Sequence, residues 1–370
     1  MRKIYVITLL TLLANLSFGQ QKIRVHNAGN TMYAKELSSI DSIKLNNTYA
    51  KFKLADDTNT LDIQKTIIDS LTFTTSSLNL DKIYIIYNGT DNATIINPYA
   101  TVGVNIIATA GTVAVNATSG IDNLEYNILG SSANGSLTIN TDKDVNLVLN
   151  NLTLTNPNGA AFDILGGKMT NFILTQGTTN TLSDGATSTR NGVITTDGPI
   201  TINNTGTLTI TSLVKHGINT ASTLAIVNGT VGVSAVSDGF HAEGFSMNAG
   251  NMTITSLGDG IDAGDGAVAI SGGTINITST SNDVKAIKTG TNTITVSGGT
   301  INLTVSGAQS KGISAKGDII ITNGTFAITL SGATVLVAET SGFNPSYACG
   351  LKSDGQIAIS GGTFTMQLLV

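Results

Sequence analysis

The sequence predicts an all-β protein built mainly from a right-handed parallel β-helix, or β-solenoid, preceded by a small β-rich appendage. Three observations lead to this fold class. Two short phrases recur along the second half of the chain, the composition suits strands and tight turns, and apolar residues alternate with polar ones with a period of two. Beyond the N-terminal region, no stretch of ten or more residues carries the apolar stripe of an amphipathic helix.

The first recurring phrase is a small residue, usually glycine, followed by an aliphatic or aromatic one. It returns at intervals of 21 to 26 residues, and once after 38. Its small residues are Gly217, Gly239, Gly260, Ala286, Gly312 and Gly350. The second phrase ends in Gly-Thr and occupies residues 228–230, 271–274, 297–300, 323–325 and 360–363. Such recurrence places similar side chains at the same position of successive turns, which favours a solenoid over a sandwich.

The composition excludes other classes of protein. Of the 370 residues, 12% are charged, 41 are glycine, 4 are proline and none is tryptophan. The abundant β-branched residues fit a pleated strand, while glycine and asparagine tolerate the left-handed corners between strands. The formal net charge of −5 argues against a nucleic-acid partner, which requires a basic surface.

Residues 1–20 are predicted to be a secretory signal peptide. Met1-Arg2-Lys3 supplies the positive charge, an apolar run follows from Ile4 to Leu13, and small residues lie near Gly19. The apolar run is too short to span a bilayer, and no other membrane span is predicted. Since the single cysteine, Cys349, does not follow the cleavage site, no lipid anchor is expected. The protein is therefore expected to be a secreted, extracellular or cell-surface monomer.

Two regions are expected after the signal peptide. Residues 21–77 carry more lysine and aspartate and are interpreted as the β-rich appendage and linker, whereas residues 78–370 form the β-helix. The predicted strands include residues 83–87, 104–108, 145–149 and 208–211. Turns stacked about 4.8 Å apart would align an internal aliphatic ladder of Ile254, Ile277, Leu303 and Ile328. Because the sequence stops in mid-strand at Val370, the natural polypeptide is expected to continue.

Residues 82–370 resemble a known family. Residues 146–156 match its diagnostic strand pair, residues 176–185 match its Gly-Thr-x-Asn-x-Leu-x-Asp-Gly turn, and residues 206–210 lead into the repeats. On these motifs the chain is similar to the bacterial secreted carbohydrate-binding parallel β-helix family, which is related in structure to calcium-dependent pectate lyases. The resemblance implies a right-handed parallel β-helix, bound Ca²⁺ and affinity for acidic polysaccharide.

An acidic column is the candidate calcium site. Alignment on the repeated glycine places Asp238 beside Asp259 and, three positions further on, His241 beside Asp262. Like charges on adjacent turns repel unless a cation intervenes, and calcium takes six to eight oxygen ligands. The predicted ligands are Asp238, Asp259, Asp262, Glu243 and Asp265. The alternative is that the Asp-Gly pairs are turn residues whose carboxylates cap backbone N–H groups.

Basic residues follow on the next turns. His241, Lys285, Lys288 and Lys311 are the predicted polysaccharide contacts, with the alternative that the lysines only compensate the charge of the aspartates. Zinc is not expected at His216 and His241, because neither a cysteine nor a third histidine lies nearby; these residues are interpreted as ladder residues or sugar contacts.

Aromatic residues are few and do not recur at the repeat spacing. Phe240, Phe245, Phe343 and Tyr347 are expected mostly to pack in the core or within loops, so stacking on a neutral glycan is not expected. The stretch between Leu330 and Cys349 breaks the repeat and is expected to be a loop that leaves the β-helix, either a binding loop or an irregular insertion.

The predicted function is non-catalytic, calcium-dependent binding of an acidic, uronate-containing polysaccharide. One alternative is a pectate-lyase-like enzyme, in which calcium acidifies a sugar proton and Lys285, Lys288 or Lys311 removes it. A second alternative is a structural adhesin or surface spacer in which the ladders serve stability alone.

Overall fold

The structure is a computed structural model that describes residues 21–27, 30–36, 40–45, 49–54, 60–64, 70–75, 82–89, 91–118 and 120–369. The predicted signal peptide lies outside the described residues. By its contacts the chain divides into two compact units, one of residues 1–83 and 96–101 and the other of residues 84–95 and 102–370. Within the described ranges, no helix has both the length and the apolar character needed to cross a membrane.

The first unit is β-rich, as the fold prediction requires of the appendage. Its strands are β1 (Gln21–Asn27), β2 (Asn30–Glu36), β3 (Ile40–Leu45), β4 (Tyr49–Leu54), β5 (Thr60–Gln64) and β6 (Ser70–Thr75). β1 pairs antiparallel with β2 and β6, and β4 pairs antiparallel with β3 and β5. Ile23, Val25, Ala50, Phe52 and Ile63 form a buried core. Along the chain, β7 (Ile83–Asn88) and β8 (Ala93–Ile96) follow, and a short 3₁₀ turn lies at Ala100–Val102.

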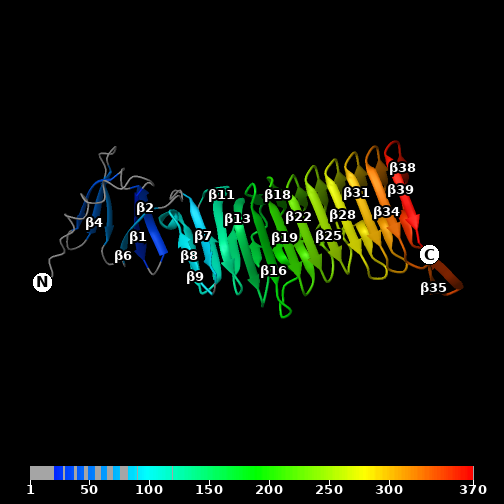
Figure 1. Ribbon diagram of the computed structural model, residues 1–370, viewed down its shortest axis with the longest axis horizontal. Coiled ribbons are helices and arrows are strands. Elements are labelled where there is room, and N and C mark those ends of the chain that lie inside the picture. The colour runs from blue at the N-terminus through cyan, green and yellow to red at the C-terminus, as the bar shows by residue number, and fades with distance from the viewer. Residues whose placement is uncertain are drawn as a thin grey trace. The chain divides into compact units, whose positions relative to one another are not determined.

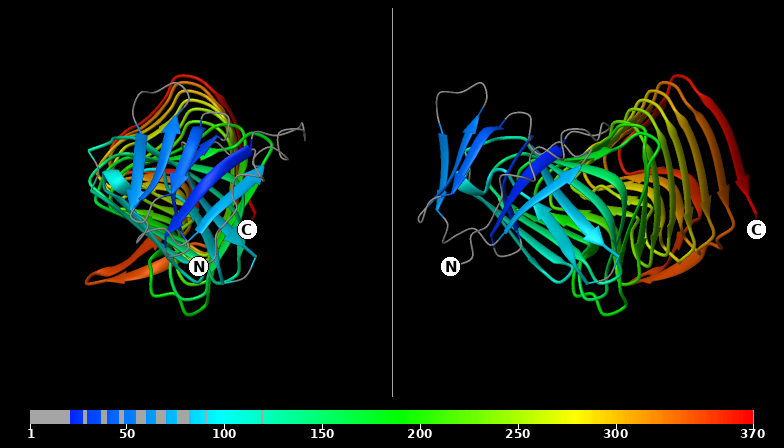
Figure 2. Two further views of the ribbon diagram at one scale, coloured as in Figure 1. Left: turned by 90° about the vertical axis from the view of Figure 1, so that its left-hand side faces the viewer. Right: turned by 60° about the vertical axis from the view of Figure 1, so that its left-hand side comes forward.

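The second unit is a parallel β-solenoid, which confirms the predicted fold class (Figures 1 and 2). A full turn contributes three short strands separated by corners, as in β20 (His216–Thr220), β21 (Leu224–Ile226) and β22 (Thr230–Ala235). Each of these three strands pairs in parallel with its equivalent on the next turn, so that three faces result. We name them the first, second and third face after β20, β21 and β22.

The strands of the solenoid are grouped by face as follows. The first face comprises β9 (Val104–Thr109), β10 (Thr112–Ala117), β12 (Ser136–Thr141), β14 (Phe162–Leu165), β17 (Gly192–Thr196), β20, β23 (Phe240–His241), β26 (Ile261–Asp262), β29 (Lys285–Thr289), β32 (Lys311–Ala315) and β37 (Cys349–Ser353). The second comprises β15 (Thr170–Leu174), β18 (Ile200–Asn203), β21, β24 (Phe245–Met247), β27 (Val268–Ile270), β30 (Ile294–Val296), β33 (Ile319–Ile321) and β38 (Ile357–Ile359). The third comprises β16 (Thr179–Asp184), β19 (Thr207–Ser212), β22, β25 (Asn251–Ser256), β28 (Thr274–Ser279), β31 (Thr300–Val305), β34 (Thr325–Leu330) and β39 (Thr363–Leu368). The long strand β13 (Val145–Asn156) pairs with both β15 and β16, and β11 (Leu124–Ser132) pairs with β13 along its length.

Columns of aliphatic side chains fill the interior of the solenoid. Ile254, Ile277, Leu303 and Ile328 lie beside one another on successive turns of the third face, and each is at most 2% exposed. The predicted ladder is therefore confirmed. Burying such a side chain contributes about 1.5–3 kcal/mol relative to leaving it in water, and a turn reaches full burial only when a neighbouring turn covers it.

The two glycine phrases meet different physical needs. In the Gly-Thr phrase, the glycine turns the corner between the second and third faces with a left-handed backbone, as at Gly229 (φ 111°) and Gly273 (φ 80°). In the other phrase, the glycine leaves room for packing. A Cβ atom on Gly239 would lie 2.4 Å from Cγ2 of Ile254 and 2.7 Å from the backbone oxygen of Gly260. The glycine of the Gly-Thr phrase therefore allows the corner between two faces. The glycine of the other phrase allows the backbone of the first face to pack closely against the interior side chains and the next turn.

One motif adopts a different local structure from the one expected. Residues 176–185 were expected to form a turn, but Thr179–Asp184 is the strand β16. Asn180 is fully buried and accepts a hydrogen bond from the backbone N–H of Leu152, just after β13 bends at Asn151 (φ 54°). It also donates to the carbonyl oxygen of Thr207 on the following turn. The motif is a strand because its asparagine satisfies backbone groups of the two adjacent turns.

The insertion before Cys349 is a two-stranded antiparallel hairpin of β35 (Val335–Glu339) and β36 (Gly342–Ser346). It leaves the repeating path after β34, as expected, and projects beside the last turns of the solenoid (Figure 1). We call it the hairpin.

Candidate functional site

The outer side of the first face carries two columns of polar residues. One column contains His216, Asp238, Asp259, Lys285 and Lys311, and the other contains Asn219, His241, Asp262, Lys288 and Ser314. We call these ten residues the polar strip. The predicted register is confirmed, because His241 pairs with Asp262 and the N–H of Gly239 bonds to the carbonyl of Asp259.

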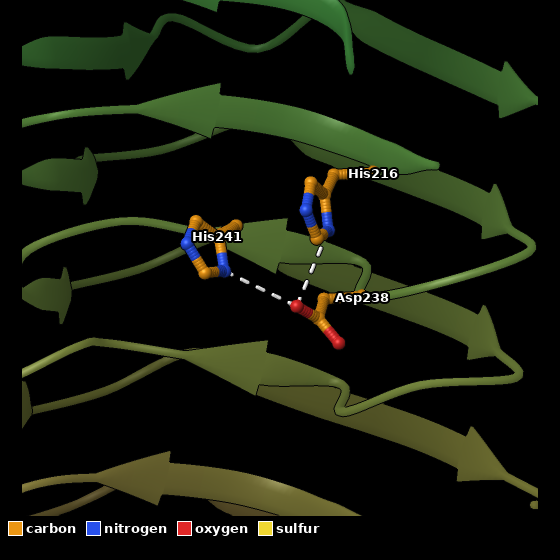
Figure 3. A group of neighbouring side chains, drawn as sticks. All are labelled: His216, Asp238 and His241. Carbon is orange, nitrogen blue, oxygen red and sulfur yellow. Dashed lines mark hydrogen bonds and ion pairs between the residues drawn. The ribbon is translucent and has the colours of Figure 1, made fainter. Parts of the chain in front are cut away.

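Asp238 is the centre of the first cluster in the strip (Figure 3). Its Oδ2 lies 3.2 Å from Nδ1 of His216, on the preceding turn, and 3.2 Å from Nδ1 of His241. The two imidazole rings stack with their centroids 4.6 Å apart. Burial raises the pKa of Asp238, but the two histidines and a backbone N–H outweigh burial and hold this pKa far below its usual range.

His241 connects this cluster to the next turn. Its hydrogen bond to Asp238 raises the pKa of its imidazole, and the nearby charge of Asp262 adds to this effect against the opposing effect of burial. Nδ1 of His241 lies 3.7 Å from Oδ2 of Asp262. The ring is 41% exposed, so the cluster is open to ligands on this side.

Lys288 lies between the next two aspartates. Its Nζ donates a hydrogen bond of 2.8 Å to Oδ2 of Asp262 and lies 3.3 Å from Oδ2 of Asp259. Burial lowers the pKa of Lys288, but the two carboxylates raise it by more. Conversely, burial raises the pKa of Asp259 despite the opposing effects of the Lys285 N–H and the Lys288 ammonium. This group of three is an ion cluster in which one ammonium compensates only part of the charge of two mostly buried carboxylates.

The carboxylates also cap backbone groups of the solenoid. Oδ1 of Asp238 accepts from the N–H of Asp259 at 2.8 Å, and Oδ1 of Asp259 accepts from the N–H of Lys285 at 2.6 Å. Oδ1 of Asp262 accepts from the N–H of Gly264 at 3.1 Å. The expectation that these aspartates cap backbone N–H groups is therefore confirmed, because each carboxylate accepts a hydrogen bond from a backbone N–H of its own turn or of the next one.

The other two predicted metal ligands serve the next corner. Oε2 of Glu243 accepts a hydrogen bond from the N–H of Asp265 at 3.2 Å, and Oδ1 of Asp265 accepts from the N–H of Thr291 at 3.0 Å. The hydrogen bonds from the backbone N–H and the hydroxyl of Thr291 lower the pKa of Asp265. Both side chains are exposed and lie in the turns that follow β23 and β26. The five predicted ligands thus fall into two sets rather than one.

The remaining predicted lysines gather around an aspartate of the preceding loop. Asp283 Oδ1 lies 3.0 Å from Nζ of Lys285 and 3.6 Å from Nζ of Lys311. The Lys311 side chain is only 8% exposed, and its ammonium donates to the carbonyl of Gln309 and, at 3.4 Å, to Oγ of Ser346 in the hairpin. Lys311 therefore joins the polar strip to the hairpin.

A pocket opens where the hairpin meets the end of the polar strip. Its volume is about 440 Å³. The lining residues are Lys311, Val337, Asn344, Pro345, Ser346, Tyr347, Cys349 and Lys352. Two ammonium groups, an amide, two hydroxyls and apolar surface converge there, which is a donor-rich lining suited to a polar ligand with an anionic group.

The aromatic residues divide between core and surface. Phe240 and Phe245 are buried, as expected, at 0% and 2% exposed. Phe343 and Tyr347 do not pack in a core: they are 69% and 59% exposed on and beside the hairpin. That part of the expectation is wrong, because an antiparallel hairpin that leaves the solenoid exposes side chains that a stacked turn would cover.

The sequence predicted parts of this pocket but not their meeting. Lys311 was predicted as a contact, Lys352 continues the same run of lysines, and the insertion that carries Asn344 and Tyr347 was expected to be a binding loop or an irregular insertion. Ser346 and Cys349 were not assigned to a site. The irregular spacing of 38 residues before Gly350 was the available indication, since it marks an insertion large enough to fold over the adjacent face.

The donor atoms of the acidic column do not fit calcium. Calcium takes six to eight oxygen ligands. Here the Lys288 ammonium already bridges Asp259 and Asp262, and the third carboxylate, Asp238, faces two imidazole nitrogens. A calcium ion among these aspartates would have to displace the ammonium and the hydrogen bonds that the carboxylates make.

Comparison with known proteins adds two findings. A family model described as "Carbohydrate-binding domain-containing protein" matches residues 107–368. Among solved structures, the gadolinium derivative of the polysaccharide lyase-like protein from C. thermocellum is similar, with a TM-score of 0.57 and 23% identity over 65% of this chain and 96% of that chain. At this identity the similarity concerns the fold alone. The search of curated proteins found no match.

Proposed function

Because this chain belongs to the family of carbohydrate-binding domain-containing proteins, we propose that it is a non-catalytic binder of acidic, uronate-containing polysaccharide. The proposed ligand lies along the polar strip and enters the hairpin pocket with one of its sugar carboxylates. The family supports carbohydrate binding, and the placement and the acidic character of the ligand are inferred from the residues of the strip and pocket.

The observation that carries this proposal is the state of Lys311. Its ammonium is almost fully withdrawn from water, whereas its ion-pair partner in the described part of the chain, Asp283, is 3.6 Å away. A buried charge is costly unless it is closely paired. A carboxylate bound in the pocket would pair with Lys311 and with Lys352, whose side chain is 44% exposed and bonded to Asp354.

The hairpin also offers groups that can contact the neutral parts of a sugar. Tyr347 lines the pocket, and it presents an exposed ring on which the apolar face of a sugar can pack. Asn344 supplies an amide that can exchange hydrogen bonds with hydroxyl groups. Anionic and neutral parts of a uronate sugar would therefore both find partners.

The lysines favour binding over β-elimination. A catalytic base at neutral pH needs a pKa lowered towards the working pH. The pKa of Lys288 is raised instead, and its ammonium is held by two carboxylates. Lys285 is likewise hydrogen-bonded to Asp283. We therefore expect no unsaturated product when polygalacturonate is incubated with the protein and the absorbance of the product is followed.

The binding test uses calorimetric titration with oligogalacturonate. Lys311→Met keeps the apolar stem and removes the charge, and Lys352→Ala removes the second ammonium. We expect each to weaken binding by about tenfold or more, since a charged hydrogen bond contributes about 1.5–3 kcal/mol. Lys143→Ala is the matched control, because this lysine pairs with Asp142 away from the pocket lining.

Two results would contradict the proposal. One is unchanged affinity in both pocket variants, and the other is equal affinity for neutral and acidic oligosaccharides of the same length. Raising the salt concentration should weaken binding in the parent protein and have less effect in Lys352→Ala.

Secretion stays a prediction from the sequence, whereas the calcium dependence expected from the sequence is not part of this proposal. Because the Lys288 ammonium already lies between Asp259 and Asp262 and pairs with both, we expect oligogalacturonate affinity to stay within about twofold after EDTA treatment. A titration in EDTA beside one with added calcium measures this. Loss of binding in EDTA that calcium alone restores would show that a calcium ion takes part and would return the acidic column to the role predicted for it.

A further inference from the structure

We propose that His216, Asp238 and His241 form a binding site for a divalent transition metal of the zinc type. This site lies within the polar strip but outside the lining of the hairpin pocket, and it does not depend on the proposed function. The three residues are brought together by successive turns of the first face: His216 begins β20, Asp238 lies two residues before β23, and His241 is the last residue of β23 (Figure 3).

The spacing of the three donor atoms fits a small ion. Zinc binds imidazole nitrogen and carboxylate oxygen at about 2.0–2.2 Å, and a tetrahedral ion then holds neighbouring donors about 3.3–3.5 Å apart. Oδ2 of Asp238 lies 3.2 Å from Nδ1 of each histidine, and all three donor atoms lie within 4.8 Å of one another. The two rings are stacked with an interplanar angle of 19°, so one of them would have to rotate for both Nδ1 atoms to face one ion beside the carboxylate.

The state of His216 is the second observation. Its side chain is 5% exposed, and within the described part of the chain its buried Nδ1 makes no aligned hydrogen bond, although it points towards Oδ2 of Asp238 at 3.2 Å. A buried polar atom without a hydrogen bond is costly. A metal ion bound to the Nδ1 lone pair would satisfy this atom, provided that the imidazole is neutral.

The chemistry of the donors selects the metal. Two imidazole nitrogens and one carboxylate are a ligand set suited to zinc, cobalt or nickel, whereas calcium prefers oxygen alone. Because the His241 ring is 41% exposed, the fourth position of the ion faces solvent. Oδ2 of Asp262, 3.7 Å from Nδ1 of His241, is the nearest further carboxylate, although it is engaged by Lys288.

Metal binding is tested on the full chain, freed of any affinity tag and stripped of metal. Calorimetric titrations with Zn²⁺, Co²⁺ and Ca²⁺, each alone, should give one saturable site for Zn²⁺ and Co²⁺ and no site for Ca²⁺ at these residues. The Co²⁺ complex should show the visible absorption of a low-coordinate site with nitrogen ligands. His241→Gln is the main variant, because this half-exposed side chain can be changed with little effect on packing.

The expected loss is at least about tenfold in Zn²⁺ affinity for His241→Gln, since even outer-shell changes cost 10–100-fold. His216→Asn should lose binding as well, and circular dichroism would show whether this buried variant is folded. His26→Gln, which changes the remaining histidine of the chain, is the matched control and should bind Zn²⁺ like the parent.

Absence of Zn²⁺ and Co²⁺ binding in the parent protein would overturn the proposal, and so would binding that His241→Gln leaves unchanged. A preference for Ca²⁺ that depends on Asp238 would overturn it too, in favour of the predicted calcium site. None of these outcomes alters the oligogalacturonate titrations of the pocket variants, so the two proposals fail separately.

Discussion

Replacing Lys288 with alanine should lower the free energy of unfolding by about 2 kcal/mol at pH 7. The ammonium lies 2.8 Å from Asp262 and 3.3 Å from Asp259, whose side chains are only 11% and 12% exposed. Removing one partner of a buried ion pair costs about 3–5 kcal/mol. We expect less here because 36% of the Lys288 side chain is exposed and solvent screens the pair.

The decrease in the free energy of unfolding caused by Lys288→Ala should depend on pH in a defined direction. Burial raises the pKa of Asp259 in the folded protein, and the Lys288 ammonium opposes this effect. Without the ammonium the pKa rises further, so the folded state binds more protons than the unfolded state above the usual aspartate value of about 3.9. Stability then falls as pH rises through this window. The difference in the free energy of unfolding between Lys288→Ala and the parent should be largest at pH 7 and should shrink as the pH falls towards about 4.

Chemical denaturation of the two proteins across this pH range measures the effect. Lys288→Arg is the matched control, since it keeps a cation between the carboxylates and should recover most of the stability. If Lys288→Ala unfolds like the parent at pH 7, or if its deficit grows on acidification, the three residues do not act as a buried ion cluster.

Replacing Gly239 with valine should destabilise the solenoid by about 1–3 kcal/mol, the usual cost of overpacking. The new Cβ atom would lie 2.4 Å from Cγ2 of Ile254 and 2.7 Å from the backbone oxygen of Gly260. The isoleucine is fully buried and the oxygen belongs to the ladder of the next turn, which accepts the N–H of Phe240. Neither atom can move without disturbing the contact between turns.

Gly232→Ala is the matched control for this change. Gly232 lies on the outer side of β22, where the nearest atom to an added Cβ is Oγ1 of Thr209 at 4.0 Å. We expect its midpoint of denaturation to be unchanged or slightly raised, because alanine reduces the freedom of the unfolded chain. Equal midpoints for Gly239→Val and Gly232→Ala would show that the recurring glycine is not required by packing.

Much of the fold followed from the sequence because the repeat carries local information. Gly229 and Gly273 mark corners that need a left-handed backbone, and the aliphatic column from Ile254 to Ile328 marks the interior. Each turn copies the preceding one, so a register read from one pair of turns holds for the others. The same logic placed His241 beside Asp262 correctly.

The sequence alone determined the architecture, its columns and the order of charges along the polar strip. The tertiary structure decided which of those charges meet. It placed Lys288 between Asp259 and Asp262, where a cation had been expected, and turned His216 towards Asp238. These outcomes depend on side-chain direction across turns, which a one-dimensional repeat does not encode. The pocket at Lys311 likewise depends on how an insertion outside the repeat folds back, and no column of the sequence specifies that path.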